Sequence, residues 1–248
     1  MINNVKNTVA SILNKDNRGY VTPEEFNQFA KQAQLDIFRE YFTNYSKAIA
    51  NQNNSRRTTT YHGSGYADIP AKMQEVIDRF VVTNVLHYNG TTAKFYMPGE
   101  DPAFPNEDKA FRIDRLTYNG VTEIEKAKRS DVLYLSSSLV APSITYPIYT
   151  LDNQGIQVLP SAITANVIAD YIRLPYDPKW TYTSLSGGEP LFNQSAADYQ
   201  DFELPTENEV DLIIKILQYA GVSIRELDVV NAMKQEELIN NQEKIWVI

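Results

Sequence analysis

Cysteine is absent from the 248-residue chain, and histidine occurs only at His62 and His87. The absence of cysteine excludes a disulfide framework, a thiolate nucleophile and a Cys-ligated metal. It also suits a protein that matures in a reducing cytosol. The two histidines are too far apart in sequence to form a two-histidine metal motif on one helix. Several common classes of enzyme and metalloprotein are therefore excluded.

The sequence also lacks an excess of positive charge and any long hydrophobic run. There are 23 Lys and Arg against 31 Asp and Glu, which gives a net charge of −8 at pH 7. An acidic surface repels nucleic acid, so a globally basic nucleic-acid binder is excluded. No stretch approaches the roughly 20 apolar residues of a membrane span, and the first residues lack the apolar core of a signal peptide. We expect no membrane partner and a protein that stays where it is made until it assembles.

Tyrosine is abundant in this chain. There are 16 Tyr and 10 Phe against 2 Trp. An apolar ring with a polar tip suits a surface that becomes buried between subunits, and it equally suits the rim of a core. A length of 248 residues allows one large domain or two small ones.

The hydrophobic pattern changes along the chain. Near both ends, apolar residues recur at spacings of three and four, which predicts helices over 2–13, 22–50, 70–81, 207–220 and 226–243. In the middle they alternate, which predicts strands over 94–97, 112–118, 146–151, 156–160 and 166–173. A hairpin turn is expected at 152–155 and a short helix at 125–137.

These elements predict an α+β fold, with a helical bundle from the N- and C-terminal helices beside a central antiparallel β region. We expect N-terminal helices over residues 1–90, with a mobile loop at 51–69. A β-rich region should follow over 91–203. Residues 204–248 should hold the C-terminal helices and an apolar tail, and both helical ends should share one bundle.

Residues 14–25 align with the twelve-residue calcium loop of an EF-hand. Gly19 falls at loop position six, as the sharp turn requires. Position one, however, is Asn14, and Arg18 replaces an oxygen ligand with a cation. This loss of oxygen ligands weakens the case for calcium.

The same residues also predict the start of a helix. Thr22 is placed at the N-cap and Glu25 three positions later, so the two form a capping box. The cap explains Glu25 without a metal, and we favour it. Asp16 and Glu25 stay as candidate metal ligands, and a calcium-binding interaction module is the alternative function.

No sequence motif supports catalysis. The Gly-rich run from Tyr61 to Tyr66 lacks the lysine and the strand-to-helix context of a phosphate-binding loop. No G-x-S-x-G motif is present, and Asp201 and Glu203 are best interpreted as solvated loop carboxylates. We predict a protein that is not an enzyme and has no cofactor. A hydrolase with a cryptic active site is a third hypothesis, because triad members need only be neighbours in space.

Several residues are candidates for contacts with other subunits. They are Arg56, Arg57 and Tyr61 in the polar loop, and Trp246, Val247 and Ile248 in the tail. Exposing the tail costs hydrophobic free energy, so it either folds onto its own domain or docks into a neighbour, which we favour. Lys126, Lys128 and Arg129 form a local basic spot. It could touch a phosphate backbone, but salt bridges to acidic neighbouring subunits fit the net charge better.

Three blocks of residues, in a fixed order, carry a resemblance to a known family. The first is RGYVTPEEFN at 18–27, followed by AQLDIF at 33–38. The second is AP at 141–142, YPIY at 146–149, IQVLP at 156–160 and YIRLP at 171–175. The third is DFELP at 201–205 and ILQYAGVSIR at 216–225. Together these blocks span nearly the whole chain. In their order, they resemble the ring (head-to-tail connector) proteins of crAss-like podovirus bacteriophages.

This resemblance implies a podovirus adaptor-like fold and a structural virion protein of the neck or tail, made in the host cytoplasm. It implies a homo-oligomeric ring, typically a dodecamer, stacked below the portal protein and against other neck and tail rings. Genomic DNA would pass through during ejection without sequence-specific binding, which an acidic conduit favours. The family has no catalytic residues to transfer. A ring interface needs two different patches on each subunit.

Overall fold

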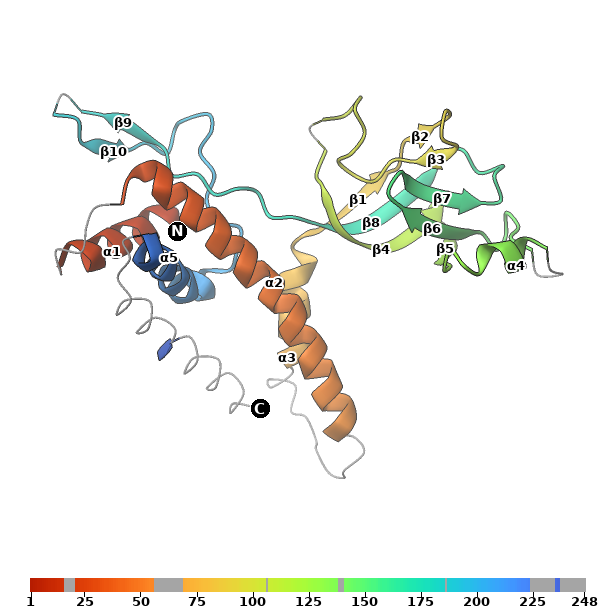
Figure 1. Cartoon of the computed structure of the whole chain (residues 1–248), viewed down its shortest axis with the longest axis horizontal. Helices are drawn as coiled ribbons and strands as arrows, with labels where there is room; N and C mark the ends of the chain where they lie inside the picture. Colours follow the sequence, from red (N-terminus) through yellow and green to blue (C-terminus); the bar gives the residue numbers. More distant parts are fainter. Residues whose placement is uncertain are drawn as a thin grey trace. The chain divides into compact units, whose positions relative to one another are not determined.

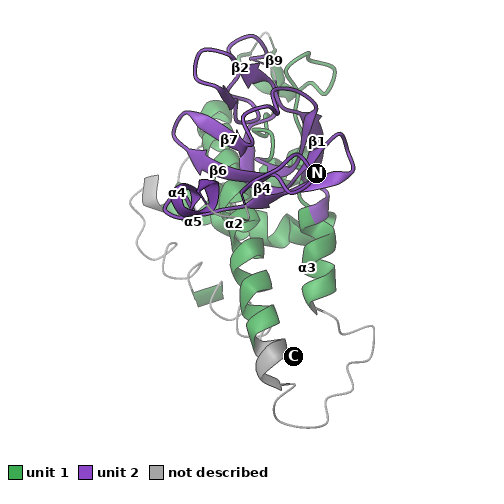
Figure 2. Cartoon of the chain, turned by 90° about the vertical axis from the view of Figure 1, so that its right-hand side faces the viewer, with its two compact units in different colours: residues 1–77, 175–248 green, residues 78–174 purple. Residues whose placement is uncertain are grey.

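The computed structural model describes residues 1–15, 21–55, 69–105, 107–137, 141–185, 187–223 and 235–236. The chain divides into two compact units (Figure 2). Unit 1 contains residues 1–77 and 175–248, and unit 2 contains residues 78–174. The expected α+β class is confirmed, because unit 1 is mainly helical and unit 2 is a large curled sheet (Figure 1).

Unit 1 is built around helix α5, which spans Glu209–Ser223. Helices α1 (Ile2–Lys15) and α2 (Pro23–Ser55) both pack on it. The sequence of α5 is apolar on most of its circumference, as expected of a central helix. The core of unit 1 combines residues from the three helices and from the segment before α5: Ile2, Val5, Val9, Leu13, Phe26, Ala30, Phe38, Trp180, Phe202, Leu204, Leu212, Ile216 and Leu217.

The remaining elements of unit 1 are short. Helix α3 spans Ile69–Asp78, its last residue belonging to unit 2, and the 3-10 helix η2 spans Thr206–Asn208. Strands β9 (Tyr182–Ser184) and β10 (Pro190–Phe192) form an antiparallel hairpin. The alternating pattern predicted no strand there. Trp180 stacks on Tyr182 and Phe192 at the base of this hairpin.

Unit 2 is an eight-stranded sheet in the order β1-β8-β4-β5-β6-β7-β3-β2. The strands are β1 (Val81–Val85), β2 (Tyr88–Asn89), β3 (Lys94–Phe95), β4 (Ala110–Tyr118), β5 (Thr122–Lys126), β6 (Ile148–Asp152), β7 (Gly155–Leu159) and β8 (Val167–Arg173). The hairpin of β6 and β7 turns at 152–155 as predicted. Inward side chains from six strands meet in one core cluster: Phe95, Leu116, Ile124, Tyr149, Ile156, Val158, Val167, Ala169 and Tyr171.

Two local predictions in unit 2 were wrong. The helix expected over 70–81 ends at Asp78, and Val81 instead begins strand β1, because β-branched residues suit a strand that pairs with β8. Within 125–137, only α4 (Val132–Ser136) is helical. The β region is also not wholly antiparallel, since β5 and β6 run parallel. Parallel neighbours need a long crossover, and residues 127–147 supply it.

The unit boundaries lie elsewhere than the expected 90/91 and 203/204. Residues 78–90 contribute β1 and β2 to the sheet, so unit 2 begins at Asp78. Residues 175–203 belong with the helices, so the chain returns to unit 1 at Pro175. In the C-terminal part, α5 continues through Gly221 to Ser223 instead of ending before the glycine. The expected helix over 226–243 lies outside the described residues, except for 235–236.

Candidate interaction surfaces

The β5–β6 connection, described over residues 127–137 and 141–147, presents apolar side chains to solvent. Leu133 and Tyr134 on α4 are 77% and 75% exposed, and Tyr146 further along is 78% exposed. Ile144 is exposed as well. Helix α4 contains no buried residue. Apolar exposure concentrated in one segment is typical of a contact site for another protein.

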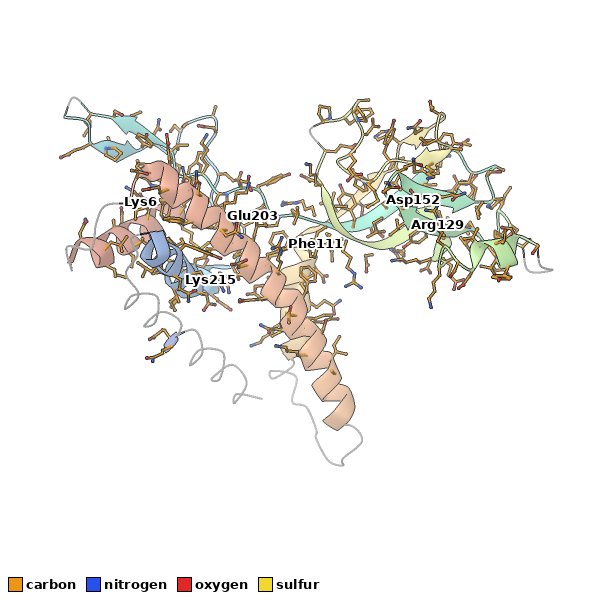
Figure 3. The ribbon with its side chains drawn as sticks, viewed as in Figure 1. Lys6, Phe111, Arg129, Asp152, Glu203 and Lys215 are labelled. Carbon is orange, nitrogen blue, oxygen red and sulfur yellow. The ribbon has the colours of Figure 1, made fainter. Side chains whose placement is uncertain are left out.

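The sheet fixes both ends of this connection side by side. The Glu125 N–H donates to the Pro147 carbonyl at 3.0 Å, and the Ala127 N–H donates to the Tyr149 carbonyl at 2.8 Å. The Arg129 guanidinium lies 3.3 Å from the Asp152 carboxylate, which ties the first part of the connection to the β6–β7 hairpin (Figure 3). The exposed apolar residues are therefore carried on an anchored segment.

Asp152 is the centre of this anchor. Lys94 Nζ donates to Asp152 Oδ2 at 2.6 Å, and the Gln154 N–H donates to Oδ1 at 2.9 Å. The hydrogen bond from Lys94, followed by that from Gln154, holds the pKa of the Asp152 carboxyl below its ordinary value, and the charge of Arg129 acts in the same direction. Asp152 is therefore a negative charge that joins β3, β6 and the β5–β6 connection.

The basic spot at the start of the connection is exposed. Lys126, Lys128 and Arg129 all face solvent. Arg129 pairs with Asp152, whereas Lys126 and Lys128 have no ion pair within the described part of the chain. Two exposed cations without an ion pair in the described ranges thus precede the exposed apolar residues of α4 by a few positions in the sequence.

In unit 1, the segment before α5 is tied to α2 by two side-chain amides. Asn27 exchanges two hydrogen bonds with the backbone of Trp180. Gln34, which is buried, donates to the Tyr176 carbonyl at 2.7 Å and accepts from the Glu203 N–H at 3.0 Å. Sequence patterns did not identify these amides, because their partners are more than a hundred residues away.

The start of α5 presents an exposed apolar residue that follows acidic residues in the sequence. Val210 is 60% exposed, which is the largest value for a large apolar side chain of unit 1 among the described residues. Glu207 is exposed and Glu209 half-exposed, and neither has a basic partner in the described ranges. The spacing of three and four that predicts the helix over 207–220 includes Val210 in its apolar face, but the structure exposes this residue.

The predicted capping box is confirmed. The Thr22 N–H and hydroxyl both donate to Glu25 Oε2 at 2.9 Å, and the Glu25 N–H donates to Thr22 Oγ1 at 3.2 Å. The backbone hydrogen bond from Thr22, with the hydroxyl second, lowers the pKa of Glu25. One oxygen of Glu25 is thus committed to the helix start. Asp16, the other candidate metal ligand, lies outside the described residues.

The other candidate contact residues also fall outside the described ranges. They are Arg56, Arg57, Tyr61, Trp246, Val247 and Ile248. In the part of the chain that the structure describes, no three His, Asp or Glu side chains gather as a metal site would require.

The carboxylates of Asp201 and Glu203 have structural partners rather than solvent alone. Asp201 accepts hydrogen bonds from the N–H groups of Ile2 at 2.7 Å and Phe202 at 2.8 Å. Glu203 accepts from the Tyr176 N–H at 2.7 Å. Both therefore hold backbone segments of unit 1 together, which corrects their interpretation as solvated loop carboxylates.

Compared with known proteins, the sequence matches no protein-family model and no curated protein. Within the described residues, no helix has both the length and the hydrophobicity needed to cross a lipid bilayer.

Proposed function

We propose that this protein is a structural, non-enzymatic subunit of a bacteriophage virion. It forms a homo-oligomeric ring in the head-tail connector, bridges the portal and the tail, and surrounds the DNA channel. The observation that carries the proposal is the apolar exposure of the β5–β6 connection. The ordered resemblance of three sequence blocks to ring proteins supports it, together with the combination of a helical unit and a β unit that podovirus adaptor subunits have.

The exposed apolar residues favour an assembly over a free monomer. Leu133, Tyr134, Ile144 and Tyr146 lie within one connection, and its helix α4 buries none of its side chains. Monomeric proteins rarely gather exposed apolar groups in this way unless a partner covers them. Tyrosine is also enriched in protein interfaces, where its ring is buried and its hydroxyl keeps a polar partner.

The charge of the chain fits a DNA conduit. With a net charge of −8, a ring of many copies repels the phosphate backbone along its channel. Because the channel does not attract the phosphate backbone, DNA can move through it during ejection. We therefore propose that genomic DNA passes through the ring without sequence-specific binding.

Native mass spectrometry and negative-stain electron microscopy of the purified full chain test the proposal. We expect closed rings, and we expect the protein in virions by mass spectrometry. Leu133→Ser combined with Tyr134→Ser should prevent ring formation. Val121→Ser is the matched control, because Val121 is 88% exposed but lies in the β4–β5 turn. A wild-type chain that stays monomeric and is missing from virions would contradict the proposal.

A further inference from the structure

We propose that the β5–β6 connection of one copy docks onto the start of α5 in the next copy of this chain. Leu133 and Tyr134 would cover Val210, and Lys126 and Lys128 would face Glu207 and Glu209. This inference rests on the proposed ring and deepens it by naming the two patches that meet. Figure 1 shows the two elements, α4 and α5.

The donor patch combines apolar area with free positive charge. Leu133 and Tyr134 are each about three-quarters exposed, at 77% and 75%. Lys126, the last residue of β5, and Lys128, at the start of the connection, are exposed and have no ion pair among the described residues. Arg129 pairs with Asp152 and so fixes the base of the patch. A partner that fits this surface has an apolar contact with negative charge beside it.

The start of α5 has the complementary chemistry. Val210 is 60% exposed, and Glu207 and Glu209 precede it by three positions and one position in the sequence. Three other acidic residues of unit 1 do have a cationic partner: Glu40 binds Lys215 at 2.8 Å, Asp177 binds Lys31 at 2.6 Å, and Asp198 pairs with Lys179 at 2.5 Å. Neither Glu207 nor Glu209 has such a cation in the described ranges. An exposed apolar residue therefore follows two carboxylates that have no ion pair in the described ranges.

The overall charge of unit 1 points in the same direction. Its residues include 14 Lys and Arg against 20 Asp and Glu, a net charge of −6, whereas unit 2 has 9 against 11, a net charge of −2. Opposite potentials across an interface steer association and fix its register. The acidic unit 1 therefore favours an approaching cationic patch, and Lys126 with Lys128 provides one.

A second copy is the occupant because a ring requires two different patches on each subunit. The donor and acceptor patches lie on different units of the chain. They differ in charge, so each contact joins the donor patch of one copy to the acceptor patch of another. Each copy that donates one patch leaves its other patch free for the next copy. Such heterologous contacts close into a ring when the rotation between copies allows it.

Charge reversal tests the pairing directly. The donor variant Lys126→Glu/Lys128→Glu and the acceptor variant Glu207→Lys/Glu209→Lys each place like charges opposite one another. Like charges opposite one another oppose association, so we expect each variant to need at least roughly tenfold more protein for half-assembly. A 1:1 mixture should restore rings, because the reversed donor of one variant meets the reversed acceptor of the other. Native mass spectrometry should find the two variants in equal number.

The matched control is Lys109→Glu/Arg112→Glu, which makes the same charge change on exposed residues of unit 2 outside the connection. It should assemble like the wild type. Circular dichroism and thermal unfolding show whether each variant is folded, and the chain carrying all four reversals should form rings alone. Ring formation by the chain with all four reversals would show that the single variants fail because of like charges and not because of a folding defect.

The outcomes separate this inference from the proposed function. Rings that form normally from both reversed variants overturn the interface and leave the ring function standing. If the donor variant binds DNA more weakly but forms rings normally, Lys126 and Lys128 contact nucleic acid instead. This result also overturns the inferred interface. If the 1:1 mixture of the two variants forms no rings, the inferred interface is also overturned. A contact between different copies would be restored in the mixture, whereas a contact within one chain would not. A monomeric wild type removes both proposals.

Discussion

Asn27 on α2 pairs with both backbone polar groups of Trp180. The Trp180 N–H donates to Asn27 Oδ1 at 2.8 Å, and Asn27 Nδ2 donates to the Trp180 carbonyl at 3.2 Å. The indole of Trp180 is buried, its Nε1–H donates to Asn3 at 3.1 Å, and Lys6 Nζ lies 3.7 Å from the ring centroid. Burial lowers the pKa of Lys6. Trp180 thus connects the segment before α5 to both α1 and α2 (Figure 3 labels Lys6).

Asn27→Ala should therefore destabilise unit 1. It leaves the buried backbone groups of Trp180 without their side-chain partner, a change that costs about 1–3 kcal/mol in free energy of unfolding. Urea unfolding followed by tryptophan fluorescence measures the loss. Gln28→Ala, on the next and exposed position of α2, is the control and should change stability by less than about 0.5 kcal/mol. Equal losses in the two variants would contradict the role given to Asn27.

Asp152 should make the stability of unit 2 dependent on pH. Lys94 first, then the Gln154 N–H, lower its pKa in the folded state below the value of about 3.9 expected in an unfolded chain. A carboxyl with a lowered folded pKa stabilises the protein at pH above the unfolded value. That stability is lost as pH falls through the folded pKa.

Asp152→Asn should reduce stability at pH 7 and give a flatter loss of stability between about pH 5 and pH 2 than the wild type. Urea unfolding at a series of pH values checks this. Asp114→Asn is the control, because Asp114 is exposed on β4. If both variants follow the wild-type pH dependence, the ion pair of Asp152 with Lys94 does not stabilise the fold.

The elements that the sequence predicted best are those whose signals are local. The cap at Thr22 and the turn at 152–155 depend on neighbouring residues, and both are as expected. Strand β1 was missed because Val81 continues the helical spacing of Ile77 and Phe80. Its pairing with β8, more than 80 residues later, decides its conformation. Local periodicity contains no information about such a distant partner.

The candidate surfaces show the same limit. Lys126 and Lys128 were recognisable as a basic spot, since charge is read directly from the sequence. The exposure of Leu133 and Tyr134 was not, because an apolar pair in a short helix normally predicts a buried face. Val210 matched the apolar face of α5, yet 60% of it is exposed. Exposure depends on which neighbours the fold brings to a position, which spacing alone does not determine.

Truncation of a buried and of an exposed leucine of unit 2 should change the free energy of unfolding by very different amounts. Leu116 on β4 is fully buried in the core cluster, whereas Leu133 on α4 is 77% exposed. Leu116→Ala should cost about 2–5 kcal/mol in free energy of unfolding, since it leaves a cavity. Leu133→Ala should stay within about 0.5 kcal/mol when measured on the monomer at low concentration. A large loss for Leu133→Ala would mean that α4 is part of the core.

Thr22→Ala should remove the cap of α2 and cost about 1 kcal/mol in free energy of unfolding. Its hydroxyl accepts from the Glu25 N–H, so the substitution leaves that N–H to water. Thermal unfolding of the variant measures the effect, with Thr43→Ala on an exposed position of the same helix as the control. The same assay with millimolar CaCl₂ should leave the wild-type midpoint unchanged, because the cap occupies Glu25. A calcium-dependent rise that Glu25→Gln abolishes would support the calcium-binding alternative instead.

Gly155 at the start of β7 should tolerate no side chain. A Cβ at this position would lie 2.2 Å from the Phe95 carbonyl oxygen on β3, and its φ of +127° is rarely adopted by other residues. Gly155→Ala must therefore push β7 from β3 and strain the turn after Asp152, at a cost of about 3 kcal/mol or more. Gly90→Ala is the matched control, because a Cβ at Gly90 would meet no atom within 4 Å. Urea unfolding of both variants should show a large loss only for Gly155→Ala, and a loss of similar size at Gly90 would contradict the contact between β7 and β3 as the cause.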